Sequence, residues 1–291
     1  MFRFLTAGES HGKGLTVIVE GVPAGLPLSE KYVNHDLARR QVGYGRGGRM
    51  EIETDRADIL SGVRHGVTFG SPISMWIENK DWATGKGPDG VPWVEEMNIN
   101  PTKTDFERIT HIRPGHADTP GISKYRQNDA RNILERSSAR ESTARVAAGA
   151  VARMFLEQFG ITVHAHVTSI GGVHAKPTYP IDWTVLEEKP FHKGYPKGSK
   201  MAAVRCADLD AAEQMIEVID AAREAGDSVG GIIEIIATGL PIGLGTHIQW
   251  DRKITTRLAA AVMSMNAVKG VEFGSGFAQA DFRGSQIHDV V

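Results

Sequence analysis

Two histidines in glycine-flanked loops carry the clearest chemical signal in this sequence. One lies in Gly8-Glu9-Ser10-His11-Gly12 and the other in Arg113-Pro114-Gly115-His116-Ala117-Asp118. A glycine beside a histidine lets the backbone approach a ligand closely, because no Cβ stands in the way. Imidazole exchanges its proton near neutral pH, and an aspartate two residues further on can orient the second ring or stabilise its charge. The two loops therefore predict proton transfer involving a small molecule. For His11 alone, a structural role satisfied by the backbone stays open.

Arginine and hydroxyl side chains gather around these loops in the sequence. Residues 135–145 read Glu-Arg-Ser-Ser-Ala-Arg-Glu-Ser-Thr-Ala-Arg, and Arg39, Arg40, Arg46 and Arg49 fall within eleven positions. Arginine forks and hydroxyls suit phosphate and carboxylate oxygens, and four neighbouring positive charges repel one another unless an anion joins them. The clusters favour a phosphorylated, anionic ligand. A solvated or salt-bridged surface is the alternative for both segments.

The composition excludes several classes of function. The chain has 291 residues, with 33 Lys and Arg against 35 Asp and Glu, so it has no overall positive field for nucleic acid. A single cysteine, Cys206, excludes an intrachain disulfide and fits a reducing compartment. No apolar stretch reaches membrane-spanning length, and the first motif follows Met1 too closely for a signal peptide. We expect a cytoplasmic protein that binds neither nucleic acid nor membrane.

Three familiar kinds of site are disfavoured. Residues 43–48 match the pattern G-x-G-x-x-G, but a helix is expected before them and a strand after, which is the reverse of a dinucleotide site. Ser10 and Ser138 do not lie in a nucleophile elbow, so serine hydrolase chemistry is not expected. His164 and His166 alternate along a predicted strand without a third ligand, and no metal site is predicted.

The elements that must position these residues alternate between strands and helices. Ser29 is expected to cap the first helix, and the small residues of 144–152 predict close helix packing in a buried layer. Residues 82–100 read as a surface loop, because Gly, Pro and Trp occur there without periodicity. Strands are predicted at 15–20, 50–59, 72–78, 229–238 and towards the end of 268–282, and helices at 29–40, 128–159, 208–225 and 251–265.

Two short segments recur. Gly-Val-Pro-Ala-Gly-Leu at 21–26 returns as Gly-Leu-Pro-Ile-Gly-Leu at 239–244, and residues 65–71 resemble 269–275. Each member of the first pair follows a predicted strand and precedes a predicted helix. Matches this short also arise by chance, so an internal duplication and coincidence both stay open. A duplication would make two related β-rich halves that share helices.

Taken together, the motifs resemble the chorismate synthase family along the whole chain. The segments that carry the resemblance are Ala7-Gly8-Glu9-Ser10-His11-Gly12, residues 43–50, residues 113–118, residues 135–141 and residues 266–274. The resemblance implies an α+β fold, namely a β-α-β sandwich in which a helical layer lies between two antiparallel sheets. It also implies that this sandwich is pseudo-duplicated and that residues 1–291 form a single domain. It also implies a homotetramer.

The resemblance implies an anti-1,4-elimination of phosphate from 5-enolpyruvylshikimate 3-phosphate. The product is chorismate, in the last step of the shikimate pathway, and the reaction uses reduced FMN with no net redox change. A flavin suits this reaction because it can lend an electron to help expel phosphate and then recover it, which no side chain can do. NADPH is a candidate source of the reducing equivalents. Flavin reduction is either built in or provided by an external reductase, and the sequence leaves this open.

The resemblance also assigns roles to residues by position. His116 would protonate the departing phosphate, and His11 would stabilise the anionic reduced flavin by protonation. The substrate's phosphate and carboxylates would be bound by Ser10, Arg40, Arg46, Arg49, Arg113, Ser138 and Arg140. The FMN-binding segments correspond to Arg136, Ser137, Ser138, Asn266 and Ala267. For Arg40 and Arg46, contact with NADP instead of substrate is an alternative.

The sequence departs from the family pattern at its carboxyl end. It stops at Val291, before the later glycine-rich flavin loop, the Lys-Pro segment and the Arg-Ser-Asp-Pro motif with a catalytic aspartate that the family carries. We therefore expect a carboxyl-terminally incomplete domain that, made by itself, folds substantially but binds FMN weakly and turns over essentially no substrate. A truncated, inactive phosphate-binding or assembly subunit is the alternative function.

Overall fold

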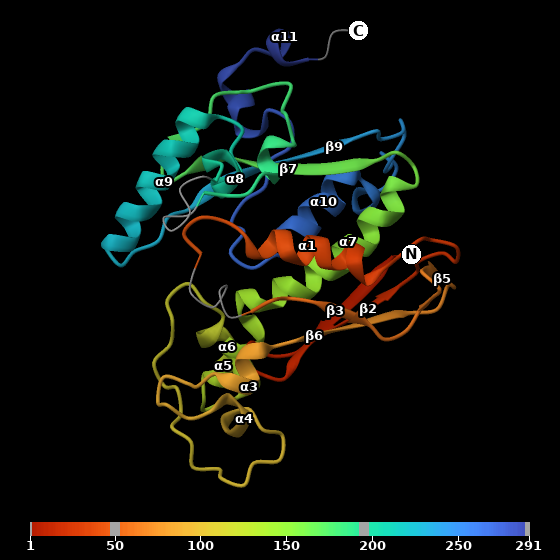
Figure 1. Cartoon of the computed structure of the whole chain (residues 1–291). Coiled ribbons are helices and arrows are strands. Elements are labelled where there is room, and N and C mark those ends of the chain that lie inside the picture. The colour runs from red at the N-terminus through yellow and green to blue at the C-terminus, as the bar shows by residue number, and fades with distance from the viewer. Residues whose placement is uncertain (1, 47–52, 192–197, 289–291) are drawn as a thin grey trace. The chain divides into compact units, whose positions relative to one another are not determined.

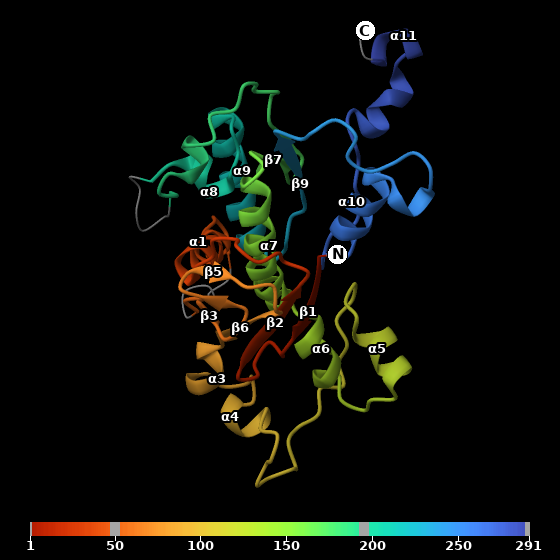
Figure 2. The same cartoon turned by 90° about the vertical axis from the view of Figure 1, so that its right-hand side faces the viewer.

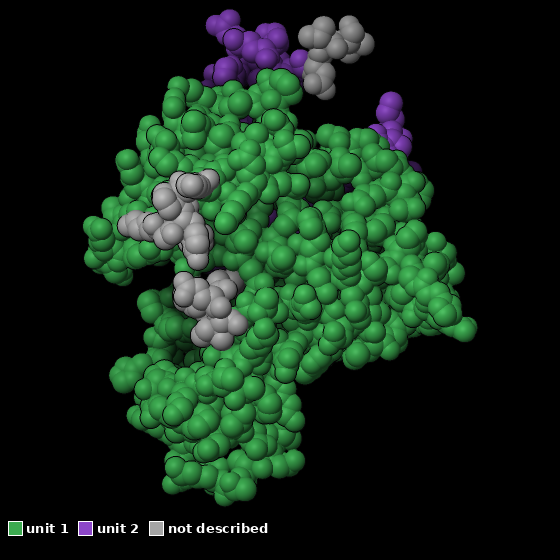
Figure 3. Space-filling view, viewed as in Figure 1, with its two compact units in different colours: residues 1–239 green, residues 240–291 purple. Residues whose placement is uncertain are grey.

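A computed structural model describes residues 2–46, 53–191 and 198–288. The chain divides into two compact units, Met1–Gly239 and Leu240–Val291 (Figure 3). The histidine loops and the arginine clusters all belong to the first unit. The second unit contains Asn266 and Ala267.

The first unit contains a four-stranded antiparallel sheet. Its order is β1-β2-β6-β3, from β1 (Arg3–Ala7), β2 (Gly14–Glu20), β6 (Ile73–Glu78) and β3 (Ala57–Ile59). Alternation in β2 buries Leu15, Val17 and Val19 on one face. Of the strand predicted at 50–59, only the part at β3 is confirmed, since residues 53–56 form no strand and residues 50–52 lie outside the described ranges. The predictions did not include β1.

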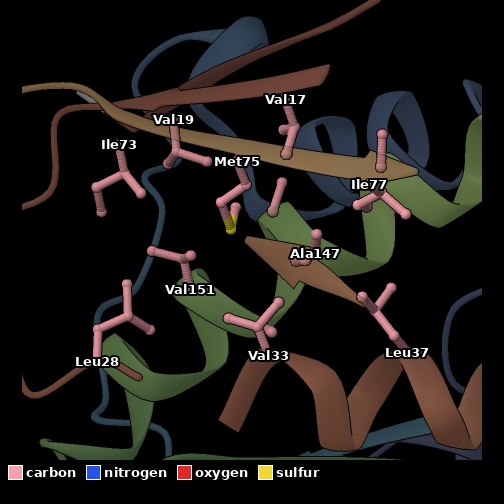
Figure 4. Close-up of a cluster of buried hydrophobic side chains, with 14 of the residues drawn as sticks. Val17, Val19, Leu28, Val33, Leu37, Ile73, Met75, Ile77, Ala147 and Val151 are labelled. Carbon is pink, nitrogen blue, oxygen red and sulfur yellow. The ribbon is translucent and has the colours of Figure 1, made fainter. Parts of the chain in front are cut away.

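Two helices cover the buried face of this sheet and complete the core around Val17 and Met75 (Figure 4). They are α1 (Glu30–Gln41) and α7 (Ser142–Glu157). Ser29 caps α1 as predicted, because its hydroxyl accepts the backbone N–H of Tyr32. In α7 the alanines at 144, 147, 148 and 150 are buried, which confirms the close packing predicted from its small residues.

The long helix predicted over 128–159 is interrupted. It consists of α6 (Arg131–Ser137), the 3₁₀ turn η1 (Ala139–Glu141) and then α7. Ser138 causes the break locally, since it is extended (φ −62°, ψ 148°) and its hydroxyl caps the backbone N–H of Arg140. The interruption redirects the chain where the predicted anion-binding residues lie.

A second sheet lies on the other side of the helices. It has the order β8-β7-β9, from β8 (Val173–His174), β7 (Thr162–Ile170) and β9 (Gly231–Thr238). The helices α8 (Lys200–Val204) and α9 (Leu209–Glu224) pack on it around Met215. In two perpendicular views α7 lies between the two sheets, which confirms the β-α-β sandwich within this unit (Figures 1 and 2).

Short elements fill the rest of the first unit. They are β4 (Val63–Arg64), β5 (Val67–Thr68), α3 (Lys80–Thr84), α4 (Trp93–Glu96), α5 (Asp118–Tyr125) and η2 (Val185–Glu187). The prediction that residues 82–100 form only a surface loop is wrong, because Trp93 is buried. Within the described ranges, no helix is both long and apolar enough to cross a membrane.

The second unit is largely helical. It contains η3 (Trp250–Arg252), α10 (Ile254–Met263), η4 (Gly276–Asp281) and α11 (Gly284–Ile287). The strand predicted near 282 is wrong, since a 3₁₀ turn occupies that segment. The repeated glycines nevertheless have matching backbones: φ is 83° at Gly21 and 75° at Gly239, and 91° at Gly25 and 96° at Gly243. In the second pair of segments, Gly66 has φ 77°, whereas its counterpart Gly270 has no positive φ. The duplication therefore stays a prediction.

Candidate active site

His11 is held by the tight loop between β1 and β2. Gly8 has φ +112°, and a Cβ there would collide with the carbonyl oxygen of Gly14, so this turn requires glycine. The backbone N–H of His11 donates to Oε2 of Glu135 at 2.8 Å, and its ring Nδ1 lies 2.9 Å from Oε1 of the same carboxylate. A buried glutamate on α6 therefore orients both the main chain and the ring of His11.

The ionisation state of Glu135 determines the tautomer of His11. Burial alone would raise the pKa of the Glu135 carboxyl, but hydrogen bonds from His11 and the positive charge of Arg131 hold that pKa below its usual value. An ionised carboxylate can only accept, so Nδ1 of His11 carries the proton. Its Nε2 then faces Oδ2 of Asp81 at 3.8 Å. Two carboxylates thus flank the ring.

An aromatic ring completes the setting of His11. Trp93 stacks on the imidazole with ring centroids 4.0 Å apart and 18° between the planes. The guanidinium of Arg131 lies 5.2 Å from the Trp93 centroid and 3.6 Å from Glu135. Stacking and the carboxylate together fix the ring in one orientation.

The same loop is tied to the predicted anion-binding residues. Ser138 Oγ donates to Ser10 Oγ at 3.0 Å. The amide of Asn79 donates to the carbonyl oxygens of Glu9 and Gly12 at 3.0 and 2.7 Å. Asn79 is fully buried, so these contacts hold the loop from the interior of the protein. The structure therefore brings Ser138 to the neighbouring residues Ser10 and His11, although 128 positions separate Ser138 from Ser10 in sequence.

Arg140 and Arg40 lie beside this loop and are paired with carboxylates. Arg140 donates from Nε to Asn79 Oδ1 at 2.9 Å and from Nη1 to Asp55 at 2.5 Å, and Nη2 lies 3.6 Å from Glu53. Arg40 shares Asp55 through Nη1 at 3.4 Å. Asp55 and Glu53 are buried, so the two guanidiniums are balanced inside the protein.

His116 has its own carboxylate. Its Nδ1 lies 2.5 Å from Oδ1 of the fully buried Asp118, and Nη2 of Arg113 lies 3.2 Å from its Nε2. Burial opposes ionisation of Asp118, but hydrogen bonds from Arg113 and His116 outweigh it and lower the pKa of that carboxyl. Nδ1 is therefore the donor to Asp118. Nη2 of Arg113 lies 3.2 Å from both ring nitrogens, so the guanidinium sits over the imidazole ring and not in line with Nε2 alone.

The His116 loop leads into the helix α5, which packs on α6. Gly121 of α5 approaches Ile133 so closely that a Cβ would overlap its side chain. Both histidine loops are therefore anchored on α6, through Glu135 for His11 and through α5 for His116. That the two imidazoles face one cleft, with Arg49, Arg140 and Ser138, stays a prediction.

The other predicted site residues lie in three places. Arg136 ends α6 and donates to the carbonyl oxygen and the hydroxyl of Thr6 at 3.0 and 2.8 Å. Arg46 lines an open groove of about 880 Å³ between α9 and the β7–β9 sheet. Asn266 and Ala267 belong to the second unit, where Ala267 has φ +69°. Arg49 lies outside the described residues.

The expectation that the arginines need an external anion to offset their repulsion is wrong in part. Arg39 lies 3.8 Å from Asp36 and 3.7 Å from Glu187, and Arg40 pairs with Asp55. Internal carboxylates therefore offset much of this charge. Sequence reasoning missed these partners, and it also missed Glu135 as an orienting residue, although Glu135 begins the motif at 135–145.

Metal chemistry finds no support here. Among the residues that the structure describes, no group of three or more His, Cys, Asp and Glu side chains could hold a metal ion. His164 and His166 lie on β7 as predicted, and His166 bonds to Glu234 at 2.7 Å. The candidate site is one for acid–base chemistry and anion binding.

Comparisons of the sequence and of the structure with known proteins point to the same family. The family model "Chorismate synthase" matches residues 2–291. A chorismate synthase of Geobacter sulfurreducens is 53% identical over 292 residues, covering 100% of this chain and 70% of that protein. Chorismate synthase 1 of Bacillus thuringiensis is 52% identical, with 99% and 71% covered. A crystal structure of chorismate synthase superposes with a TM-score of 0.75 at 43% identity, covering 99% of this chain and 74% of that one.

Proposed function

The chain belongs to the chorismate synthase family, and we propose that its two histidine loops and the adjoining arginines form the active site of that enzyme. The reaction is the anti-1,4-elimination of phosphate from 5-enolpyruvylshikimate 3-phosphate, which gives chorismate. The single observation that carries the assignment is the pairing of each imidazole, His11 and His116, with a buried, ionised carboxylate through Nδ1. Each Nε2 is then the atom at which a proton can be held or transferred.

His116 is the general acid in this proposal. A second proton at its Nε2 makes an imidazolium that Asp118 stabilises, and transfer of that proton neutralises the departing phosphate. The guanidinium of Arg113, half exposed and 3.2 Å from Nε2, would bind the phosphate oxygens at the same place. Acid and anion-binding group therefore act on one leaving group.

His11 would hold a proton at Nε2 where negative charge gathers on the reduced cofactor. Glu135 and Asp81 lie at the two ring nitrogens of His11. Trp93 stacks against it and keeps the plane fixed. This arrangement supports charge stabilisation better than nucleophilic attack.

The substrate's phosphate and carboxylates would be bound by the arginine and serine cluster around these loops. Ser10 and Ser138 are linked by a hydrogen bond beside His11, and Arg140 and Arg40 are held nearby by Asp55. Rigid donors lose little conformational freedom on binding, which favours tight recognition of anions. The full proposed set is Ser10, Arg40, Arg46, Arg49, Arg113, Ser138 and Arg140.

The residues proposed to bind FMN have suitable donor chemistry. Arg136 has a half-exposed guanidinium, and its contacts with Thr6 use only Nη2. The hydroxyls of Ser137 and Ser138 follow in sequence and donate to the carbonyl oxygen of Ile133 and to Ser10, so they would turn to a ligand only by giving up these bonds. Such donors suit a phosphate group. Asn266 and Ala267 would add an amide and a backbone contact. When bound, reduced FMN supplies an electron transiently to help expel phosphate and recovers it afterwards.

Four further features belong to this proposal. We infer a homotetramer in the cytoplasm, by analogy with the family. NADPH is the proposed source of reducing equivalents, and an external flavin reductase is the proposed partner. Contact of Arg40 and Arg46 with NADP instead of substrate is the alternative within it.

An anaerobic assay tests the function directly. Purified protein that carries a family-type carboxyl-terminal segment is mixed with chemically reduced FMN and 5-enolpyruvylshikimate 3-phosphate, and chorismate is followed by its absorbance. The 291-residue chain is assayed beside it. We expect turnover that falls about 10²-fold or more in H11A and in H116A, as general acid–base groups require. H35A, which removes an exposed histidine of α1, is the matched control. Absence of turnover with every reductant, or full activity in H116A, would contradict the proposal.

A further inference from the structure

A tyrosine–aspartate contact holds the arginine loop, defined here as residues 43–46, against α9. The hydroxyl of Tyr44 lies 3.0 Å from both carboxylate oxygens of Asp220. The backbone N–H of Tyr44 donates to the carbonyl oxygen of Ala203 at 2.8 Å, at the end of α8. The residue is therefore bonded through both its main chain and its side chain, to two different helices.

The neighbouring residue brings the loop close to the helix. Gly45 has φ +74°, and a Cβ there would lie 2.5 Å from Cγ2 of Ile219, which precedes Asp220 on α9. Only glycine allows the loop to pass so near with this backbone conformation. The ring of Tyr44 also stacks on Phe191 at 5.9 Å and packs with the buried residues of α8 and α9.

The electrostatic setting keeps Tyr44 as a donor. Burial and the hydrogen bond to Asp220 raise the pKa of the Tyr44 hydroxyl to about 12, so it keeps its proton at neutral pH. Arg223, one turn further along α9, lies 4.0 Å from Asp220 and 6.0 Å from the Tyr44 ring centroid. The contact is thus a hydrogen bond to a charged acceptor, which is stronger than a neutral one.

The loop leads directly to an arginine of the proposed substrate site. Arg46 follows Tyr44 by two residues and lines the groove between α9 and the β7–β9 sheet, together with Ser169 and Gly230. Burial beside the groove lowers the pKa of its guanidinium, although the residue as a whole stays exposed to solvent. Where Arg46 lies therefore depends on where Tyr44 is fixed.

We propose that Tyr44 and Asp220 are positioning residues, which hold the arginine loop on α9 and so place Arg46 for an anionic group of the substrate. This inference rests on the proposed function, because it assumes that Arg46 binds substrate. Neither residue touches the reacting atoms in this proposal. Their contribution is to substrate binding in both the ground state and the transition state, and not to the chemical step.

Kinetics of matched variants test the proposal. Y44F removes the hydroxyl and keeps the ring, and D220A removes the acceptor. We expect either to raise KM for the phosphorylated substrate about three- to tenfold, the loss of one hydrogen bond to a charged group, with kcat nearly unchanged. D220N keeps an acceptor oxygen and should lie nearer the unsubstituted protein. Y44F/D220A should cost no more than D220A alone, because both remove one interaction.

A second tyrosine provides the control. Tyr32 of α1 donates to Glu157 of α7 at 2.7 Å, so Y32F makes the same chemical change away from the arginine loop. Hydrogen exchange of the peptide covering residues 42–46 should become faster in Y44F and stay unchanged in Y32F. This measurement needs no turnover and reports the loop itself.

The outcomes separate this inference from the function on which it depends. If the unsubstituted protein neither binds nor converts the substrate, the proposed function fails and the inference fails with it. If the protein is active and Y44F matches it in KM, the inference alone is overturned, whatever the exchange rates. A fall in kcat at constant KM would also overturn it, since that result would give Tyr44 a role in the chemical step.

Discussion

Glu135 accepts hydrogen bonds from both the backbone N–H and the ring of His11, although 124 residues separate the two in sequence. The carboxylate therefore sets the position of the loop and the tautomer of the imidazole with one side chain. Removing its charge without changing its shape separates these two functions.

E135Q should reduce kcat strongly and change the free energy of unfolding only slightly. The amide keeps an oxygen for the backbone N–H of His11 but no longer provides the negative charge that favours an imidazolium. We expect kcat to fall about 10²-fold, the low end for a group that supports proton transfer. The anaerobic assay measures this, and E157Q on α7 is the matched glutamate control. An E135Q protein with unchanged kcat would show that His11 works without this carboxylate.

D118N should disable His116 in a similar way. An amide at residue 118 can donate to Nδ1 and stabilise the opposite tautomer, with the proton on Nε2. We expect kcat to fall by about 10²-fold or more, as for other histidines whose orienting aspartate is replaced. The slope of the pH–rate profile should change as well. D105N, on an exposed aspartate earlier in the chain, is the control. A merely structural Asp118 would change the unfolding midpoint and leave the pH profile of the remaining activity intact.

D55A should destabilise the fold strongly. Asp55 is buried and neutralises Arg140, which is itself 5% exposed, and it also contacts Arg40. Removing one partner leaves buried positive charge without compensation, which typically costs about 3–5 kcal/mol. Urea unfolding followed by circular dichroism measures the change. D58A, three residues further on and exposed on β3, should cost about 0.5 kcal/mol or less. Equal effects of the two substitutions would contradict the role of the buried pair.

Acid should destabilise the protein through Glu135 and Asp118. The pKa of each carboxyl is lower in the folded protein than in the unfolded chain. Such groups bind fewer protons when folded, so their contribution is fully present above the unfolded values of about 4 and disappears as pH falls through the folded values. The free energy of unfolding should therefore decrease below about pH 5. In the E135Q/D118N protein this decrease should be smaller, and an unchanged pH dependence would contradict it.

Local patterns in the sequence predicted much of the fold, and the exceptions have physical causes. The cap at Ser29 and the small-residue face of α7 depend on neighbouring residues, so both could be read from the sequence. The break at Ser138 could not, because helix-forming residues surround it and its hydroxyl competes with the helix only in this tertiary setting. Burial of Trp93 likewise depends on contact with His11, 82 positions earlier in the numbering.

The candidate site was predicted to a similar extent. Residue types and loop glycines pointed to His11, His116 and the arginines, since these carry the chemistry themselves. Their partners Glu135, Asp55 and Asn79 come from distant segments, and only the folded chain brings them together. The proposed roles of Arg49, Asn266 and Ala267 stay predictions.

The buried contacts of Arg140 also bear on how inhibitors of this protein would lose effect. Asn79 joins Arg140 to the His11 loop, so replacing either residue disturbs the hydrophobic sheet and the reactive loop at once. A compound that binds Arg140 would thus depend on a side chain whose substitution the protein tolerates poorly. Replacing the half-exposed Arg113 or Arg136 would leave the core intact, but it would weaken the binding of phosphate or FMN proposed for these side chains.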